Sequence, residues 1–289
     1  MTGVNPNVSV VIPCGAEILY LKKQLIALSQ QDFRGSVEII LSDNYGNLDE
    51  SNLDVVALPA NWSLKVVDSS ERAGASHARN VGWKHATAPS VLFCDADDEV
   101  APMWVSSLMA ALGTSSLVGG RLEYERLNHR VDAAWSGGQS DALRTKFNHL
   151  PFNPTCNLGV HRDVLVAIDG FDTELARGQD IDFCWRAQYH GGTMAFASSA
   201  VVHYRLRQER LELWSQSYSY GLSDAILMKK HAVWGAKRLI RDSNREFLSV
   251  FKSGLQAILI PRYGRKFISR IANLSGRIVG TLRQRTWVI

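Results

Sequence analysis

The chain has 289 residues, of which 46% are hydrophobic and 21% are charged, and its net charge at pH 7 is +4. This composition supports a buried core in one large domain, or in one domain with an appendage, and excludes disorder as the default. No apolar run approaches the roughly 18 residues of a transmembrane helix, and MTGVNPN lacks the features of a secretory signal. Four scattered cysteines without a C-x-x-C pair add to the expectation of a cytoplasmic protein.

Charge is divided unevenly along the chain. Residues 229–289 contain fourteen Lys and Arg against two acids, a balance of +12, which leaves 18 basic and 26 acidic residues, or −8, in residues 1–228. Two regions of opposite charge are expected to have different roles. We therefore predict a first domain over residues 1–225 and a basic, helical extension over residues 226–289.

Runs of strand-forming residues alternate with helical patterns through the first domain. Strands are predicted at 8–13, 37–42, 55–58, 64–67, 91–94, 117–125 and 200–207. Helices are predicted at 17–29, 73–88, 103–112, 160–168 and from 179 onward, with a polar loop at 127–150. Such alternation is typical of an α/β fold that has a mainly parallel sheet with helices on both faces.

Three carboxylates follow the predicted strand at 91–94, in the sequence VLFCDADDEV. Open α/β sheets bind ligands at the carboxyl ends of their strands, and Mg²⁺ and Mn²⁺ prefer carboxylate oxygens. Asp95 and Asp97, two residues apart, are therefore candidates to share a divalent ion with a sugar phosphate. The local pattern alone leaves a solvated acidic turn as an equal alternative, and it leaves the role of Asp98 open.

The usual phosphate-binding loops are missing after the first strand, where neither G-x-G-x-x-G nor G-x-x-x-x-G-K-[ST] is present. If phosphate is bound, a metal on carboxylates must neutralise much of its charge, which gives the acidic cluster more weight. The same absence counts against a nucleotidyltransferase. Such an enzyme needs a Gly- and Arg-rich phosphate loop where this chain has CGAEILYLKK.

A second acidic site opens a predicted helix in GQDIDFCWR, residues 178–186. An Asp at a helix start is favoured by the free backbone N–H groups there, so Asp180 needs no function. In a chain that already has a carboxylate cluster, however, a separate carboxylate can take a proton. Farther along, AVVHYRLR places His203, Arg205 and Arg207 on one side of a strand, where they would suit a metal and a diphosphate.

Four segments, in their order and spacing, resemble the family 2 glycosyltransferases, which are inverting enzymes with the GT-A fold. The segments are VSVVIP, ERAGASHARNVGWKHATAPSVLFCDADDEV, CNLGVHRDVLVAIDGFDTEL and GQDIDFCWRAQYHGG. The resemblance covers roughly residues 8–225. It implies a GT-A catalytic domain over 1–225, with a nucleotide-binding sheet, followed by the basic helical extension.

The resemblance also implies roles for individual residues. Asp180 would be the catalytic base, and Asp97 would hold Mn²⁺ or Mg²⁺ together with His203. The residues that would bind the nucleotide-sugar donor are Pro13, Asp43, Arg79, Asn80, Asp95, Ala96, Asp97, Arg205 and Arg207. The residues that would bind the acceptor are Asn157, Gln179, Asp182 and Trp185.

The chain departs from the family pattern at three places. Cys14-Gly15-Ala16 replaces a polar-aromatic-Asn turn after the first strand, and Asp43-Asn44 keeps one acid of a common Asp-Asp pair. These two departures leave the nucleotide undetermined. Gln179 replaces the usual Glu before Asp180, which removes a negative charge and would lower the proton affinity of Asp180.

The implied activity is the metal-dependent transfer of a sugar, with inversion, from a UDP-, dTDP- or GDP-linked donor to an acceptor hydroxyl. The acceptor would be a glycan, a lipid-linked molecule or a small molecule, in the assembly of a glycan, polysaccharide or glycolipid. The enzymatic alternative is the nucleotidyltransferase. The non-enzymatic alternative is a catalytically silent GT-A module that binds a partner, against which the intact acids at 95, 97 and 180 argue.

The basic extension contains an apolar stripe with basic residues along its flank, which predicts an amphipathic helix. The stripe is Phe267, Ile271, Leu274, Ile278 and Leu282, and the flank is Lys266, Arg270 and Arg277. Such a helix either packs on the catalytic domain or lies on an anionic membrane surface, and the sequence favours neither. In the second case the protein would be peripheral at the inner face of the membrane. Nucleic acid is not an expected partner, because no known binding module is present.

Overall fold

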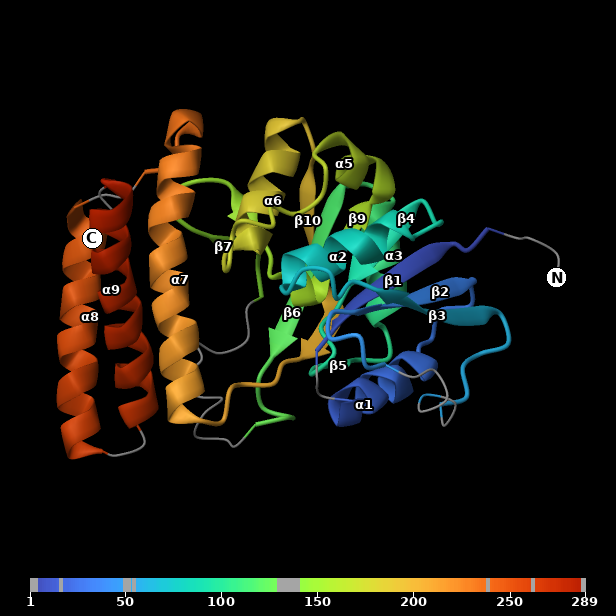
Figure 1. The fold of residues 1–289 in the computed structure, drawn as a ribbon, viewed down its shortest axis with the longest axis horizontal. Coiled ribbons are helices and arrows are strands. Elements are labelled where there is room, and N and C mark those ends of the chain that lie inside the picture. Colours follow the sequence, from blue (N-terminus) through green and yellow to red (C-terminus); the bar gives the residue numbers. More distant parts are fainter. Residues whose placement is uncertain are drawn as a thin grey trace.

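The computed structural model describes residues 5–15, 18–48, 53, 56–128, 141–237, 240–260 and 263–286. Within these residues one large mixed sheet is covered by helices on both faces, and three long helices stand beside it (Figure 1). Residues that alternate along a strand face opposite sides of a sheet. In the first strand, accordingly, Val10 and Ile12 belong to one hydrophobic core and Val11 belongs to the other.

The sheet contains eight strands in the described part of the chain. In order across the sheet they are β3 (Trp62–Asp68), β2 (Val37–Asp43), β1 (Val8–Cys14), β4 (Ser90–Phe93), β9 (Leu158–His161), β6 (Leu117–Glu123), β10 (Met194–His203) and β5 (Glu99–Val100). The first four are parallel to one another, as are β6 and β10, whereas β9 and β5 run antiparallel to their neighbours. A separate short pair is formed by β7 (Arg144–Thr145) and β8 (Pro151–Phe152). The predicted α/β class and mainly parallel sheet are confirmed.

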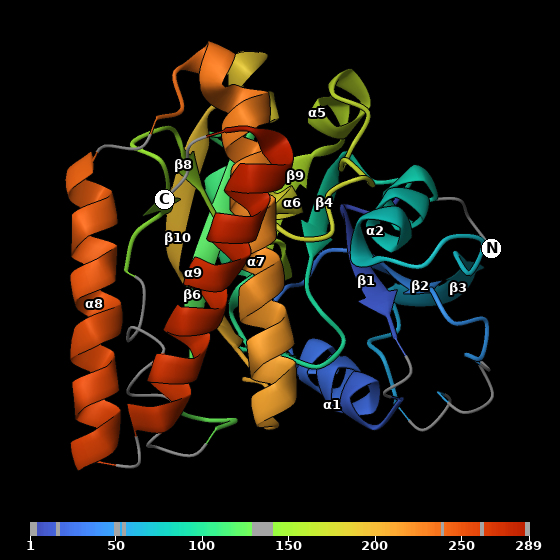
Figure 2. The same ribbon diagram turned by 60° about the vertical axis from the view of Figure 1, so that its left-hand side comes forward.

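Helices on the two faces contribute to different cores. Residues of α1 and α3 belong to one core, and residues of α2, α5 and α6 belong to the other. The helices that cover the sheet are α1 (Ile18–Ser29), α2 (Ala75–Lys84), α3 (Trp104–Leu112), α5 (Arg162–Ala167) and α6 (Gln179–Tyr189). The long helices are α7 (Arg210–His231), α8 (Ile240–Leu259) and α9 (Gly264–Gln284), and two 3₁₀ turns are η2 (Thr155–Asn157) and η3 (Ala232–Trp234). Figure 2 shows α9 lying along α7, with α8 on the outside.

Some predicted elements differ in the structure. The predicted helix at 160–168 begins as strand β9, because residues 158–161 pair with β4 and residues 158–160 also pair with β6. Only residues 162–167 are helical. The strand predicted at 200–207 ends at His203, so the two arginines after it lie beyond the sheet. Residues 56–58 form no strand. Residue 55 of that prediction, and residues 129–140 of the predicted loop, lie outside the described residues.

The predicted boundary between residues 225 and 226 falls inside a single helix, since α7 runs from Arg210 to His231. Helix α9 packs on α7 through glycines. A Cβ at Gly276 would lie 2.1 Å from the carbonyl oxygen of Tyr218, so the two backbones are in direct contact there. Helix α9, which contains the predicted amphipathic stripe, therefore packs on the rest of the chain. Among the described residues, no helix is long and apolar enough to cross a membrane.

Candidate active site

A cavity of about 1090 Å³ opens at the carboxyl ends of β1 and β4. Parallel strands bring the residues that follow them to one edge of the sheet, which is where such sheets bind ligands. Among the residues that line it, those on α2 or at or after the ends of sheet strands are here named the sheet side: Pro13, Arg79, Asp95, Ala96, Asp97 and Arg207. Those at or next to β7 and the start of α6, and on α7 and α9, are here named the helix side: Arg144, Lys146, Arg177, Gln179, Asp180, Tyr220, Arg270 and Asn273.

The carboxylates of the sheet side are paired with arginines. An oxygen of Asp95 accepts a hydrogen bond of 2.6 Å from Nη2 of Arg79, whose side chain is buried. Asp97 forms an ion pair of 3.4 Å with Nη1 of Arg207. The structure thus brings these four predicted donor residues together at one wall. Arg205 instead points behind it, where its Nε donates to the carbonyl oxygen of Asp97 and its guanidinium lies 4.2 Å from the ring centre of Tyr20.

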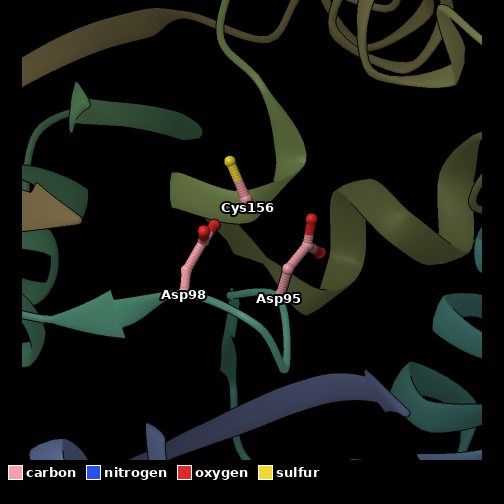
Figure 3. A group of neighbouring side chains, drawn as sticks. All are labelled: Asp95, Asp98 and Cys156. Carbon is pink, nitrogen blue, oxygen red and sulfur yellow. The ribbon is translucent and has the colours of Figure 1, made fainter. Parts of the chain in front are cut away.

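Asp98, whose role the sequence left open, is buried beside Asp95 and Cys156. Figure 3 shows the two carboxylates and the thiol, and one possible ligand atom from each lies within 4.8 Å of the others. One oxygen of Asp98 accepts a hydrogen bond of 2.8 Å from the backbone N–H of Arg205, and the other is buried without a hydrogen-bond partner. Burial, followed by the negative charges of Asp97 and Asp95, raises the pKa of Asp98 well above its usual range.

This acidic group fits a divalent cation. A buried carboxylate with an unpartnered oxygen is stabilised by a positive charge, and hard cations prefer such oxygens. Asp95 and Asp98 supply two carboxylates, with Asp97 as the next acid on the same turn. The thiol of Cys156 is the weakest member of this set for Mg²⁺ or Mn²⁺, because thiolates suit softer metals and burial raises the pKa of Cys156 well above its usual value.

The predicted metal ligand His203 is not brought to Asp97. It ends β10, where Nδ1 lies 2.6 Å from a carboxylate oxygen of Glu123 and Nε2 lies 3.2 Å from Nη1 of Arg126. Both ring nitrogens therefore have partners in the chain, and His203 does not line the cavity. The sequence pattern correctly placed His203 on a strand, but it could not show that the imidazole would face Glu123 and Arg126.

Two other predicted donor residues support the walls of the cavity without lining it. The Asp43 carboxylate, at the end of β2, accepts hydrogen bonds from the backbone N–H groups of the next loop, at Tyr45, Gly46 and Leu48. The Asn80 amide bonds both the N–H and the carbonyl oxygen of Phe171. These contacts fix loops next to the cavity, so a direct contact of either side chain with a nucleotide stays a prediction.

Asp180 faces the cavity from the first turn of α6. The helix begins after Gly178, whose φ of 75° favours glycine and where a Cβ would lie 2.7 Å from Leu227. Burial raises the pKa of Asp180 above its usual value, although a backbone hydrogen bond from Ile181 and the charges of Arg79, Lys146 and Arg144 oppose the change. A carboxylate with a raised pKa and access to a cavity is suited to accept a proton near neutral pH.

Of the four predicted acceptor residues, only Gln179 lines the cavity. Asp182 is fully buried and is held by Arg186, Lys230 and His231. Burial raises its pKa, but the hydrogen bond from His231 and the neighbouring cations outweigh burial and lower it below its usual range. A helix turns by about 100° per residue, so a side chain two positions after Asp180 points toward the core.

The other two predicted acceptor residues are also part of the core. Trp185 donates its indole N–H to the carbonyl oxygen of Leu150, at 2.8 Å. Asn157 accepts a hydrogen bond of 2.9 Å from the indole of Trp104 and donates to two backbone carbonyl groups of the sheet. Both side chains are fully buried, so they shape the frame of the cavity and do not contact its contents.

Sequence reasoning missed most of the helix side. The missed residues are Arg144 on β7, Lys146 directly after it, Arg177 before α6, Tyr220 on α7, and Arg270 and Asn273 on α9. They come from distant segments and match no local motif. The basic flank of the amphipathic helix was the one available signal, because it contains Arg270. Asp224, buried on α7, connects these segments by bonding both Lys146 and Nε of Arg277.

Comparisons with known proteins agree with this geometry. Residues 9–168 match the family model described as glycosyl transferase family 2. The "Pre-mycofactocin glycosyltransferase" of Mycobacterium tuberculosis is 26% identical over 238 residues, which are 78% of this chain and 48% of the relative. "Glycosyltransferase AglE" of Haloferax volcanii is 25% identical over 205 residues, which are 70% of this chain and 67% of the relative. The chain thus spans about half the length of the mycobacterial relative.

Solved structures share the fold at low sequence identity. The mannosyltransferase PcManGT from Pyrobaculum calidifontis, in complex with GDP-Man and Mn²⁺, has a TM-score of 0.62 at 17% identity and covers 98% of this chain and 89% of its own. TarS 1–349 of S. aureus, in complex with UDP-GlcNAc, has a TM-score of 0.53 at 16% identity and covers 98% of this chain and 93% of its own. Because the family model covers more than half of the sequence, the chain belongs to glycosyl transferase family 2, with a GT-A fold.

Proposed function

We propose that this protein is a metal-dependent, inverting glycosyltransferase that moves a sugar from a nucleotide-diphosphate donor to an acceptor hydroxyl. The observation that carries the proposal is the arrangement of one cavity. On its sheet side, Asp95 and Asp97 form ion pairs with arginines. On its helix side, burial raises the pKa of the Asp180 carboxylate. A displacement at a sugar carbon needs both a place for the departing charge and a base for the incoming hydroxyl.

The sheet side would hold the donor. Mn²⁺ or Mg²⁺, when bound by Asp97, Asp95 and Asp98, would neutralise the diphosphate. Arg79 and Arg207 form ion pairs with Asp95 and Asp97 in the structure. With the donor bound, they would contact its phosphate oxygens, because a guanidinium binds carboxylate and phosphate alike. The family 2 resemblance supports this assignment, as does the structural neighbour PcManGT, which was solved in complex with GDP-Man and Mn²⁺.

The helix side would activate the acceptor. Asp180 accepts the proton of the attacking hydroxyl, and the hydroxyl oxygen bonds to the anomeric carbon as the nucleoside diphosphate leaves from the opposite face. One displacement inverts the configuration at that carbon. Gln179, beside Asp180, offers an amide for hydrogen bonds to the acceptor without adding a second negative charge.

We further propose UDP-, dTDP- or GDP-linked sugars as donors, and a glycan, lipid-linked or small-molecule acceptor. Among the structural neighbours, one is described with GDP-Man and another with UDP-GlcNAc, so nucleotide identity varies within the fold. We place the protein at the inner face of the membrane as a peripheral protein. The +12 balance of residues 229–289 supports this location, because basic segments are attracted to anionic lipids.

A thermal-shift panel of UDP, GDP and dTDP, each with and without Mn²⁺, tests the donor assignment. The cognate nucleotide is expected to raise the melting temperature only when Mn²⁺ is present, since a ligand that binds the folded state stabilises it. In Asp97→Ala, calorimetry is expected to show metal-dependent affinity lowered by about a hundredfold. Unchanged Mn²⁺-dependent affinity in this variant would remove Asp97 from the metal site, and donor hydrolysis by the wild type would exclude a silent binding module.

A further inference from the structure

Helix α8 turns its large apolar side chains away from the protein. Six of them are between 46% and 80% exposed: Phe247, Leu248, Phe251, Leu255, Ile258 and Leu259. They recur at steps of three and four residues, so they form one continuous face of the helix. Figure 1 and Figure 2 both show α8 at the outer edge of the molecule. The six residues are here named the α8 face.

The side of α8 that packs on α9 is made of small residues. Ser253 is fully buried, and a Cβ at Gly254 would lie 3.2 Å from the ring of Phe267. A surface helix of a soluble domain normally has the reverse arrangement, with its large apolar residues turned inward. A contiguous exposed apolar face of this kind marks an interaction surface, because a lone soluble domain seldom exposes one.

Charge identifies the partner. Arg245 and Lys252 are exposed on α8, beside the α8 face, and residues 229–289 carry a balance of +12. A second copy of the chain would bring the same positive charge to the contact and would be repelled. An anionic lipid surface satisfies both observations, since acyl chains accept the apolar face and headgroups attract the cations. We propose that α8 docks this protein on an anionic bilayer, with the α8 face entering the boundary between headgroups and acyl chains.

The docked helix would lie one helix away from the cavity. Arg270 of α9 lines the helix side of the cavity and donates a hydrogen bond of 2.8 Å to the carbonyl oxygen of Ser249 on α8. If the proposed function holds, a lipid-linked acceptor held in the bilayer is brought close to Asp180. The docking itself does not depend on that function and is measured without a donor or an acceptor.

Co-sedimentation of the full chain with lipid vesicles tests the docking. Vesicles of phosphatidylglycerol mixed with phosphatidylcholine are expected to bind the protein, and vesicles of phosphatidylcholine alone are expected to bind it at least tenfold more weakly. The triple variant Phe251→Ser, Ile258→Ser, Leu259→Ser is expected to lose about a hundredfold in affinity for the mixed vesicles. The double variant Arg245→Gln, Lys252→Gln is expected to lose about tenfold, and added salt is expected to weaken the wild type similarly.

A matched control changes exposed apolar residues elsewhere. Leu19→Ser, Val166→Ser, Leu211→Ser removes three side chains that are as exposed as those of the α8 face, and it is expected to bind vesicles like the wild type. Circular dichroism and thermal unfolding check that each variant is folded. Equal binding to both kinds of vesicle, or equal loss in the control variant, would overturn the proposal. So would a dimer in light scattering that the triple variant abolishes while the wild type binds no vesicles.

The arginines of the helix side differ from those of the sheet side in their partners. On the sheet side, each cation of the cavity has a carboxylate partner, and Lys146 is paired with Asp224. Among the described residues, Arg144, Arg177 and Arg270 have no carboxylate within ion-pair distance. Their contacts are neutral: the phenol of Tyr124 for Arg144, the ring face of Tyr220 for Arg177, and a backbone carbonyl for Arg270.

A partly buried guanidinium without a carboxylate is stabilised by an anion that enters the cavity. All three arginines line the cavity that also holds Asp180, and none of them forms an ion pair with Asp95 or Asp97, whose partners are Arg79 and Arg207. Resting on the proposed function, we infer that the acceptor carries a negative group, such as a phosphate or a carboxylate, close to the hydroxyl that receives the sugar. Arg177 and Arg270 bind that group and position the hydroxyl at Asp180.

Titration calorimetry of the protein loaded with Mn²⁺ and UDP tests this inference, with glycerol 3-phosphate as the anionic probe and glycerol as the neutral one. The phosphate compound is expected to bind, glycerol is not, and the double variant Arg177→Gln, Arg270→Gln is expected to weaken phosphate binding about tenfold or more. UDP affinity is measured separately and is expected to be unchanged in the variant. A parallel loss of UDP affinity would assign the arginines to the donor, and absence of phosphate binding in the wild type would also refute the inference. Failure of UDP to bind at all would instead refute the proposed function.

Discussion

The two sides of helix α6 place the same side chain in opposite environments. Asp180, on the cavity side, has a pKa that burial raises, with cations at a distance. Asp182, on the core side, forms short ion pairs with Arg186, Lys230 and His231, which together lower its pKa despite its burial. Direct cationic partners, more than burial, therefore decide which carboxylate keeps its negative charge and which can exchange a proton. We therefore expect Asp180 to affect turnover and Asp182 to affect the free energy of unfolding.

Asp180→Asn gives the largest expected effect on activity. The variant removes the base and keeps the shape of the side chain, so turnover is expected to fall by about 10² to 10⁴ while donor binding and the free energy of unfolding stay near wild type. Steady-state kinetics and urea unfolding measure the two quantities. Near-normal turnover would show that another group takes the proton.

Asp182→Asn is expected to give the converse result. Removing the buried carboxylate leaves Arg186 and His231 without their acidic partner, while Lys230 keeps its ion pair with Asp172, and the loss costs about 3 to 5 kcal/mol in the free energy of unfolding. Urea unfolding measures the loss, and the folded fraction is expected to retain turnover. A stability equal to wild type would contradict the role of Asp182 as an anchor between α6 and α7.

Asp182 is also expected to make the stability of the wild type depend on pH in the acid range. A carboxylate whose folded pKa is lowered stabilises the protein fully above its unfolded pKa of about 4. This contribution is lost as the pH falls below that value toward the folded pKa of Asp182. Unfolding measured between about pH 5 and pH 2 is expected to show this slope in the wild type and a smaller slope in Asp182→Asn.

Arg144→Gln is expected to shift the pH profile of turnover. Asp180 must be ionised to accept a proton, so activity falls as the pH drops through its folded pKa. The charge of Arg144 lowers that pKa, and removing this charge is therefore expected to move the acid limb to higher pH. The profile of kcat, measured at saturating donor and acceptor, checks this. A limb that moves to lower pH would contradict the assigned base.

Gln179→Glu is expected to give a smaller shift in the same direction. The substitution restores the acid that the family usually has before the catalytic Asp and places a negative charge beside Asp180, which raises its proton affinity. Because Gln179 is partly exposed, solvent screens the effect, and a shift of a few tenths of a pH unit is expected. The same kcat profile measures it, with Gln179→Asn as the neutral control.

The sequence predicted those site residues that a local pattern of neighbouring residues marks. The end of β4 and the acids after it were predicted because an apolar run that stops at Asp95 is a local pattern. The start of α6 near Asp180 was predicted in the same way, from a glycine followed by an acid and apolar residues. The family resemblance implied an acceptor role for Asp182 and Trp185, which follow Asp180 closely in sequence, but the helix turns both side chains into the core. Nearness along a helix does not show which way a side chain points.

The helix side could not be predicted for a different reason. Arg144, Arg177 and Arg270 come from three segments that no motif connects, and they meet only because α9 folds back on α7. The glycines that permit this contact, Gly221 and Gly276, resemble ordinary glycines in the sequence. Only the packed structure shows that each backbone occupies the space where the other helix would need a Cβ.

The contact of α9 with α7 also sets an order for folding during synthesis. The residues of the sheet side other than Arg207 lie between residues 13 and 97, whereas Arg270 and Asn273 of the helix side follow much later in the chain. Chains generally begin to fold from their amino terminus as they emerge. A nascent chain that has not yet released α9 would therefore have most of its sheet side and only part of its helix side. Translation to the end of α9 is thus the step that completes the lining of the cavity.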